Sequence, residues 1–215
     1  VTFEELRDNL YEQISRRRSQ ANAFSMAQTI ENIASAVDND AFTGSVFTFA
    51  DGQPMISTVH VNATGGTYSN ALSPAADFSE TSAEDMCIQI MGVQTDRGLL
   101  VNIMPQSLHI ARQEWFNANR VLKSVLQSDV ANNNINVLKA TNALPQGIKL
   151  NHYFTSPHAW WIRTNCLNGM QFFWRDRTFF DQDNDFDTKN AKAASYMRFS
   201  VGGTDPRSIF GSNGP

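Results

Sequence analysis

Three features of this 215-residue sequence predict an α+β fold. Near the start, apolar residues recur every three or four positions, which is the spacing of one face of a helix. The middle of the chain alternates helical patterns with a β-prone run, and two longer β-prone stretches near the end flank an acidic turn. Helices and strands grouped in separate segments are typical of the α+β class.

The composition indicates a chain with a substantial core. Hydrophobic residues make up 41% of it, charged residues only 18%, and 15 residues are Phe, which is too apolar for a disordered protein. The formal net charge of -4 argues against a basic face that grips phosphate backbones. No apolar run approaches the ~18 residues of a membrane span, and no signal peptide is recognisable. We therefore expect a soluble protein made in a cytoplasm.

Cys87 and Cys166 are the only two cysteines, and their separation fits neither a zinc motif nor a CxxC pair. Two reduced, buried thiols are expected instead of a disulfide framework. The chain begins at Val1 without an initiator Met and enters a helical pattern almost at once. That start indicates a truncated or processed end.

The N-terminal region predicts a long helix. Thr2 followed by Glu5 forms a capping-box pattern, and the apolar stripe that starts at Phe3 continues to Val37 with no Gly or Pro before Gly44. One long helix or two nearly collinear ones fit this pattern. Between its two halves lies a basic triplet, which is either a solvated helix face or an inter-subunit salt-bridge cluster. The triplet is Arg16, Arg17 and Arg18.

The next segment, residues 42–72, has short β-prone pieces broken by glycines, which predicts a hairpin and loops. Thr81 and Glu84 form a second capping-box pattern, which predicts a helix that stops at residues 96–98. After that stop, residues 99–104 are expected to form a strand.

A second long helix is expected after Pro105, which we interpret as the end of that strand. Ser107 is the predicted cap of this helix. Trp115 and Leu122 are seven residues apart and are therefore expected on its buried face.

The last part of the chain is expected to contain four strands, a polar turn and a loose tail. The turn is 129–134, the strands are 135–140, 159–163, 170–180 and 193–201, and the tail is 202–215. The last two strands suit a long hairpin around an acidic turn at residues 181–187.

No catalytic or metal-binding motif is found. None of the four histidines forms HExxH or a similar ligand pair, and GxSxG, Walker A and strand-linked GxGxxG motifs are missing. We therefore predict no catalytic residue, no cofactor and no metal ligand. The alternating aspartates of the acidic turn resemble a calcium loop, but Phe186 and Lys192 stand where such a loop has Gly and Glu. A solvated turn that binds no ion is expected there.

Four strings, read in order, resemble the tailed-phage major capsid proteins of the Hong Kong 97-type fold, in particular the Mu-like prophage major head subunits. Each string carries several residues of a family pattern, and together they span residues 42 to 212. They are Asp51-Gly52 through His60 to Ser69-Asn70; Asp77-Phe78-Ser79 with Gln94 to Pro105; Ala159-Trp160-Trp161-Ile162; and Asp205-Pro206-Arg207 to Ser212.

The resemblance implies a long spine helix, a peripheral β-hairpin domain and an inserted axial α/β domain. On this basis residues 1–75 and 169–215 form the peripheral domain and residues 76–168 the axial domain. Family members carry an N-terminal arm and an extended loop before the spine helix, for which this chain has no room. The Lys-to-Asn cross-link that some relatives form therefore cannot be assigned to any residue here.

The implied function is structural: a non-enzymatic subunit that assembles with identical copies into hexamers and pentamers of an icosahedral phage head. The shell would enclose double-stranded DNA without reading its sequence, in a virion assembled in the cytoplasm of a host bacterium. Portal, scaffold and maturation protease are the further partners, and no membrane is involved. Subunit contacts are expected at seven residues, which are Arg16, Arg17, Arg18, Phe172, Trp174, Phe180 and Arg198.

Two alternatives remain open. A shell protein of the same fold, such as an encapsulin or a gene-transfer-particle subunit, differs in its cargo and not in its sequence pattern. A small α+β hydrolase or binding protein would instead use the region of Asp51 and His60 together with the aromatic strands.

Overall fold

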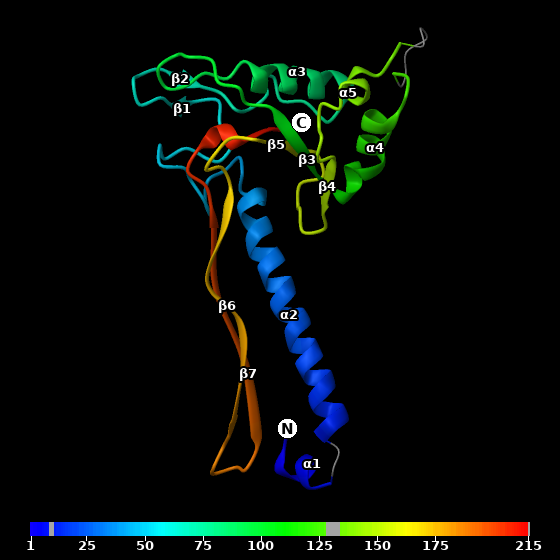
Figure 1. Ribbon diagram of the computed structural model, residues 1–215, viewed down its shortest axis with the longest axis vertical. Helices are drawn as coiled ribbons and strands as arrows, with labels where there is room; N and C mark the ends of the chain where they lie inside the picture. The colour runs from blue at the N-terminus through cyan, green and yellow to red at the C-terminus, as the bar shows by residue number, and fades with distance from the viewer. Residues whose placement is uncertain (9–10, 128–133, 215) are drawn as a thin grey trace. The chain divides into compact units, whose positions relative to one another are not determined.

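The structure is a computed structural model that describes residues 1–8, 11–127 and 134–214. The chain divides into two compact units: residues 1–34 with 172–201, and residues 35–171 with 202–215 (Figure 1). The second unit is thus largely an insertion between the two parts of the first. The peripheral and axial domains named above refer to positions in a shell, and their boundaries stay a prediction.

The first unit begins with two helices, α1 (Phe3–Arg7) and α2 (Tyr11–Asn39), of which α2 has 29 residues and continues past the boundary of the unit. The predicted capping box is confirmed: the Glu5 backbone N–H donates to Thr2 Oγ1 over 3.3 Å, and the Thr2 N–H donates to Glu5 Oε2 over 2.9 Å. These bonds satisfy two of the backbone donors that a helix start leaves open. The expectation of a long N-terminal helix is met by α2.

The rest of the first unit is a long hairpin made of β6 (Gln171–Asn184) and β7 (Ala191–Gly202), as the sequence predicted. A backbone hydrogen bond of 3.0 Å from Asp185 to Asn190 closes its turn. The predicted acidic turn is too long, however, because Asp181 and Asp183 still belong to β6. Aspartates are rare in strands, but here they lie on an exposed ribbon where their carboxylates stay hydrated.

The second unit is built on a four-stranded sheet in the order β4-β3-β5-β8. β3 pairs with β4 in parallel and with β5 antiparallel, and β5 pairs antiparallel with β8. The strands are β3 (Pro105–Ala111), β4 (Ile148–Asn151), β5 (Ala159–Thr164) and β8 (Ile209–Asn213), with a separate ladder of β1 (His60–Val61) and β2 (Thr67–Tyr68). The helices are α3 (Glu80–Met91), α4 (Trp115–Lys123) and α5 (Val137–Ala140), with 3-10 turns at Arg112–Glu114 and Pro206–Ser208.

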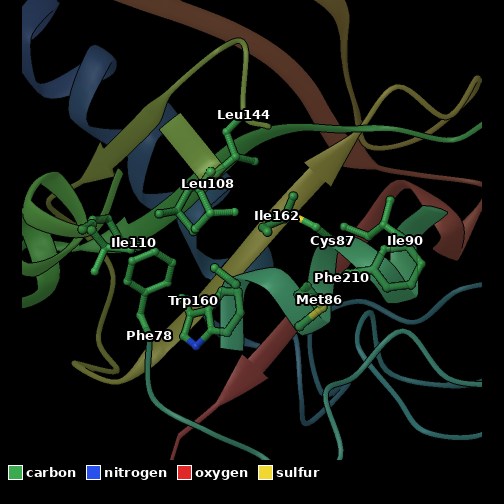
Figure 2. Packing of buried hydrophobic residues seen from close by; sticks show 14 of the residues in the cluster. Phe78, Met86, Cys87, Ile90, Leu108, Ile110, Leu144, Trp160, Ile162 and Phe210 are labelled. Atoms are coloured by element: carbon green, nitrogen blue, oxygen red, sulfur yellow. The ribbon is translucent and has the colours of Figure 1, made fainter. Parts of the chain in front are cut away.

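One face of this sheet carries the main core (Figure 2). Alternate residues of neighbouring strands point to it, such as Leu108 and Ile110 of β3 and Trp160 and Ile162 of β5. Phe210 of β8 joins them, and the further buried partners come mainly from α3: Met86, Cys87 and Ile90. The indole N–H of Trp160 donates to the Ala76 carbonyl over 3.0 Å, so this side chain buries no unpaired donor.

The prediction of a helix capped by Ser107 is wrong. Residues 105–111 form the central strand β3, and Pro105 starts this strand instead of ending the previous one. Proline is tolerated at the first residue of a strand because its missing N–H breaks no ladder bond there. The expected strand at residues 99–104 is reduced to a single bridge between Gln94 and Leu100, and α4 begins only at Trp115.

Three further expectations need correction. Helix α3 is capped by Ser79, whose partner in the capping box is Ser82, so the helix starts before Thr81. Residues 137–140 are the short helix α5 instead of a strand, because the Asn136 side chain accepts from the Lys139 N–H at 3.2 Å. Most of the polar turn predicted at 129–134 lies outside the described residues.

The C-terminal tail is not loose. Residues 209–213 form β8, and Ile209 and Phe210 are fully buried. The alternation that places Phe210 in the core could have been found in the sequence, but the flanking Gly, Ser and Asn residues obscured it. The strand at residues 159–163 is confirmed as β5.

The buried side chain of Asn70 joins three loop segments of the second unit. Its Nδ2 donates to the carbonyls of Met55 at 2.8 Å, Ile209 at 3.0 Å and Pro206 at 3.1 Å. Its Oδ1 accepts the Ser57 N–H at 2.7 Å. One amide therefore satisfies four backbone groups at a site that is shielded from water.

We expect Asn70→Leu to lower the free energy of unfolding by more than about 3 kcal/mol, because several buried backbone groups lose their partner at about 1–3 kcal/mol each. The same change at the exposed Asn102 is the matched control and should cost less than about 0.5 kcal/mol. Urea unfolding of both variants measures the difference. Equal stability of the two variants would contradict the role given to Asn70.

Helix α4 offers a second test, because adjacent aromatic residues differ in burial. Trp115 packs against the core cluster, as does Leu122, whereas Phe116 is 77% exposed. Trp115→Ala should destabilise the protein by roughly 2–4 kcal/mol, somewhat less than a fully buried Trp. Phe116→Ala should change it by less than about 0.5 kcal/mol. A pair of thermal melts that coincide would show that Trp115 does not belong to the core.

Candidate assembly surface

The hairpin of the first unit carries more aromatic side chains than two strands can cover. Phe172 stacks on Phe199 with ring centroids 5.0 Å apart, and Trp174 meets Phe199 at 5.7 Å. Phe172 and Trp174 nevertheless remain 37% and 39% exposed. Within the described part of the chain β6 pairs only with β7, and a two-stranded ribbon needs an additional covering surface to be stable.

Helix α2 covers part of one face of this ribbon. Asn22 Nδ2 donates to Ser195 Oγ over 2.7 Å, which fixes α2 to β7. Beside this bond lies an apolar groove of about 350 Å³. Its lining includes Ala23, Met26, Ala27 and Ile30 of α2 with Thr178 and Phe180 of β6.

The opposite face of the ribbon carries a different pattern. Phe179 and Tyr196 meet across the hairpin with centroids 5.4 Å apart, and both are about half exposed. Because side chains alternate along a strand, Phe179 faces away from Phe180, and Arg198 lies on the same face as Tyr196. Arg198 is exposed. This face therefore mixes aromatic and charged groups in contact with solvent.

The three arginines near the start of α2 have different surroundings. Arg16 lies 3.4 Å from Glu12 on the same helix, and Arg18 lies 3.4 Å from Glu5 of α1. Arg17 is exposed. Exposed ion pairs of this kind contribute roughly 0–1 kcal/mol, so the guanidinium groups stay available to other carboxylates. The inter-subunit role predicted for these arginines stays a prediction.

Two of the seven predicted contact residues come together in a hollow of about 600 Å³. Arg18 and Phe180 both line it, together with Val1 and the acidic end of β6. The amino group of Val1 donates to the Ala191 carbonyl over 3.0 Å, so the chain start forms one wall. Phe172 and Trp174 form a separate cluster, and Arg198 lies on the other face of the ribbon.

The Asp51–His60 pair expected by the hydrolase alternative does exist in the second unit. Asp51 Oδ2 lies 2.7 Å from His60 Nδ1, but the imidazole is fully buried. Tyr68 stacks on it at 5.3 Å, and the edge of Phe49 lies 6.1 Å away. A ring enclosed by two aromatic side chains has no access to a substrate, so the geometry favours a structural pair.

Arg207 completes this cluster from the other side of Tyr68. Its guanidinium carbon lies 4.6 Å from the Tyr68 ring centroid, a cation–π contact. The same group forms ion pairs with Asp96 at 2.5 Å and Asp205 at 3.4 Å, and it donates to Asn62 Oδ1 at 3.2 Å. Arg207 therefore holds three loops together, a role that the sequence reading did not assign.

The second face of the sheet holds another polar group that the sequence reading missed. Arg163 of β5 donates to both carboxylate oxygens of Asp38 at 3.1 and 3.2 Å. Nearby, burial and the positive charges of Arg163 and Lys149 lower the pKa of His109 to about 3, so this ring is neutral and accepts or donates in its 3.0 Å bond with Ser107. These contacts join β5 to Asp38 and link two side chains of β3.

The two cysteines are free. Cys87 is buried, and burial together with Glu84 raises the pKa of its thiol to about 11. Burial and Asp205 raise the pKa of Cys166 to about 12, although this residue is only partly buried. Thiols with such pKa values are poor nucleophiles at neutral pH. Among the described residues, no three His, Cys, Asp or Glu side chains gather in a geometry suited to a metal ion.

In the described parts of the chain, no helix combines the length and the hydrophobicity of a membrane span. The acidic end of the hairpin includes a 2.5 Å ion pair between Asp185 and Lys192. The Lys192 ammonium group is therefore paired with Asp185, which is one of the carboxylates that a calcium ion would need. The absence of a specific ion at residues 181–187 stays a prediction.

A chain that exposes aromatic clusters on a long ribbon and encloses the Asp51–His60 pair has the character of an assembly subunit. The family comparison agrees: residues 1–211 match the family described as phage capsid protein. The chain belongs to the phage capsid protein family and is a shell-forming structural protein with an α+β fold.

No curated protein matches the chain. Among solved structures, it is similar to a virus-like particle from Pyrococcus furiosus. That similarity has 10% sequence identity and a TM-score of 0.42, and it covers 66% of this chain and 55% of the other. The chain thus spans little more than half the length of that relative.

The buried Asp51–His60 pair predicts a specific pH dependence. Burial opposes ionisation of Asp51, but hydrogen bonds from His60 and the Gln53 N–H outweigh it and lower the pKa of this carboxyl group. Because the pKa is lower in the folded state, the ionised carboxyl group stabilises the fold at every pH above the ordinary Asp pKa of about 3.9. This stabilisation is lost as the pH falls through the folded-state pKa.

We therefore expect Asp51→Asn to lower the stability at pH 7 by about 1–2 kcal/mol and to reduce the further loss between pH 5 and pH 3. The exposed Asp187→Asn serves as the control and should follow the parent at every pH. Denaturant unfolding across this pH range measures both effects. An Asp51→Asn curve parallel to the parent curve would show that the pair is not a source of acid sensitivity.

Proposed function

We propose that this chain is the major head subunit of a tailed phage, with the Hong Kong 97-type fold, and belongs to the subfamily that includes the Mu-like prophage head subunits. Identical copies form hexamers and pentamers, which close into an icosahedral shell around double-stranded DNA. The observation that carries this proposal is the family match over residues 1–211 together with the uncovered aromatic ribbon.

The ribbon and α2 are the proposed contact surfaces between copies. Closed rings require head-to-tail contacts, in which one patch of a subunit meets a different patch on its neighbour. The apolar groove beside Phe180 and the cluster of Phe172 and Trp174 are two such patches, separate from each other. Arg16 and Arg17 supply positive charge near the start of α2. We expect each contact to bury more than about 1,000 Å², which exceeds most crystal contacts.

The proposed cargo contact is non-specific. With a net charge of -4 the chain has no basic excess with which to bind DNA tightly, so the DNA is enclosed and not read. Portal, scaffold and maturation protease are the proposed partners in assembly, in the cytoplasm of a host bacterium. An encapsulin-type container is the alternative within the same class, and it is distinguished by a protein cargo in place of DNA.

Assembly is tested with purified protein that carries any residues preceding Val1 in its natural chain. Sedimentation velocity and electron microscopy should show closed particles, and particles from infected or induced cells should contain nuclease-protected DNA. Nuclease-sensitive particles filled with a protein cargo would favour the encapsulin alternative. A parent protein that stays monomeric at high concentration would refute the proposed function.

The double variant Phe172→Ser, Trp174→Ser tests the aromatic cluster. We expect at least about tenfold fewer particles, because the apolar area that these side chains bury between subunits is lost. Phe116→Ser, which removes an aromatic residue of the second unit that is 77% exposed, should assemble like the parent. Circular dichroism must show that the double variant is folded. Normal assembly by a folded double variant would exclude the cluster from the interface.

A further inference from the structure

Strand β6 contains a palindrome in which the charges are inverted about its centre. Phe179 is the centre: Arg177 and Asp181 lie two residues before and after it, and Arg175 and Asp183 lie four residues before and after it. All five residues are in β6, so they alternate with residues of the other face and point to the same side. At the usual strand rise the paired charges stand about 7 Å and about 13 Å from the centre.

These four charges have no opposite charge within the described structure. All are exposed, and none forms an ion pair with another described side chain. The two carboxylates accept only the backbone N–H of the next residue. Arg198 of β7 lies on the same face, which adds a third positive charge to the basic half. Like charges on neighbouring positions of a sheet repel, so a strand that brings opposite charges to these positions would be favoured.

The backbone of β6 is also unpaired on one side. In the described residues this 14-residue strand is one of only two strands in its sheet, and it pairs with β7 alone. An edge strand of this length has a row of N–H and C=O groups that can pair with another strand, once the N–H groups of Gln182 and Asn184 leave the Asp181 and Asp183 carboxylates to which they donate. Charged residues protect such an edge against most partners, but not against a strand with the complementary charge sequence.

We propose that β6 pairs antiparallel with β6 of a second copy of this chain, across a two-fold axis at Phe179. In this register each residue faces the residue equally far on the other side of Phe179. Arg177 then lies opposite Asp181 of the second copy, and Arg175 lies opposite Asp183, each pair in both directions. Cross-strand neighbours have Cβ atoms about 4.5–5.5 Å apart, which is within reach of an Arg–Asp ion pair.

This inference rests on the proposed function and adds a contact to it. The contacts that close a ring are head-to-tail, whereas this one is two-fold symmetric and uses the same patch on both copies. It would therefore connect subunits of neighbouring rings. The face opposite this one is covered by α2 through Asn22 and Ser195, so the pairing leaves that contact intact.

Charge exchange tests the pairing. Arg175→Asp with Arg177→Asp makes the palindrome entirely acidic, and Asp181→Arg with Asp183→Arg makes it entirely basic. Each double variant alone should yield at least about tenfold fewer particles, because four like charges then face four like charges. Assembly should return when the two double variants are mixed, and also in the fourfold variant, in which every charge is reversed but the complementarity is restored.

A cysteine at the centre tests the register. Phe179→Cys faces itself across the axis and should be joined to a second copy by a short bis-maleimide in assembled particles. Phe173→Cys, on the same face but six residues from the axis, should not be joined, and the parent measures any background from Cys87 and Cys166. Covalent dimers are counted on a denaturing gel.

The outcomes separate this pairing from the proposed function. Normal particles from either double variant, or loss of assembly that neither the mixture nor the fourfold variant restores, would overturn the pairing and leave the shell function standing. Equal cross-linking at positions 173 and 179 would also overturn it, because the register would be wrong. A parent that forms no particles would refute the shell function itself.

Discussion

The side-chain amide of Asn70 is the interaction on which the second unit depends. It binds backbone groups of Met55, Ser57, Pro206 and Ile209, which belong to two segments about 150 residues apart in the sequence. Backbone bonds continue the same connection, since Asn70 O accepts from the Gly211 N–H at 3.0 Å and the Leu72 N–H donates to Gly211 O at 3.1 Å. The amide thus holds the loop segments beside β8, whose ladder with β5 places Phe210 in the core.

The first unit is stabilised in a different way. Within the residues that the structure describes, its hairpin is a two-stranded sheet of its own, and its aromatic residues are partly covered by one another and by α2. Such a ribbon gains little from burial within one chain, so much of its apolar surface is left for other subunits. The second unit thus has a closed hydrophobic core, whereas the first unit exposes apolar surface. This division agrees with a protein whose role is to assemble.

The sequence predicted the elements whose signals are local. The α+β class, the long helix α2, the long hairpin and β5 were all predicted, because their patterns are long or strongly β-prone. The segment at residues 105–111 was mistaken for a helix because Leu108 and Ala111 also fit a helical stripe. This segment forms a strand because it pairs with β4 on one side and β5 on the other. Both partners are distant in sequence, so they leave no local signal.

The site residues divide in the same way. The aromatic residues of β6 were found because they are many and adjacent. Arg207 and Asn70 were named only as parts of strings that resemble a family, since nothing in their immediate neighbours shows that their side chains bind loops distant in sequence. The charge palindrome was overlooked because its acidic half was assigned to a turn. Once β6 is seen to extend to Asn184, the two halves fall on one strand.

The order of the segments along the chain also governs when the protein can fold during translation. Helix α2 is made early, but the ribbon that it contacts is made only after about 130 further residues, and β8 comes last of all. Contacts so distant in sequence form late. During translation, a chain that still lacks its C-terminal part therefore has neither a complete core in the second unit nor a complete ribbon in the first. Only full-length chains become competent to join their copies, and chains that end before Ile209 are left to the proteases of the cell.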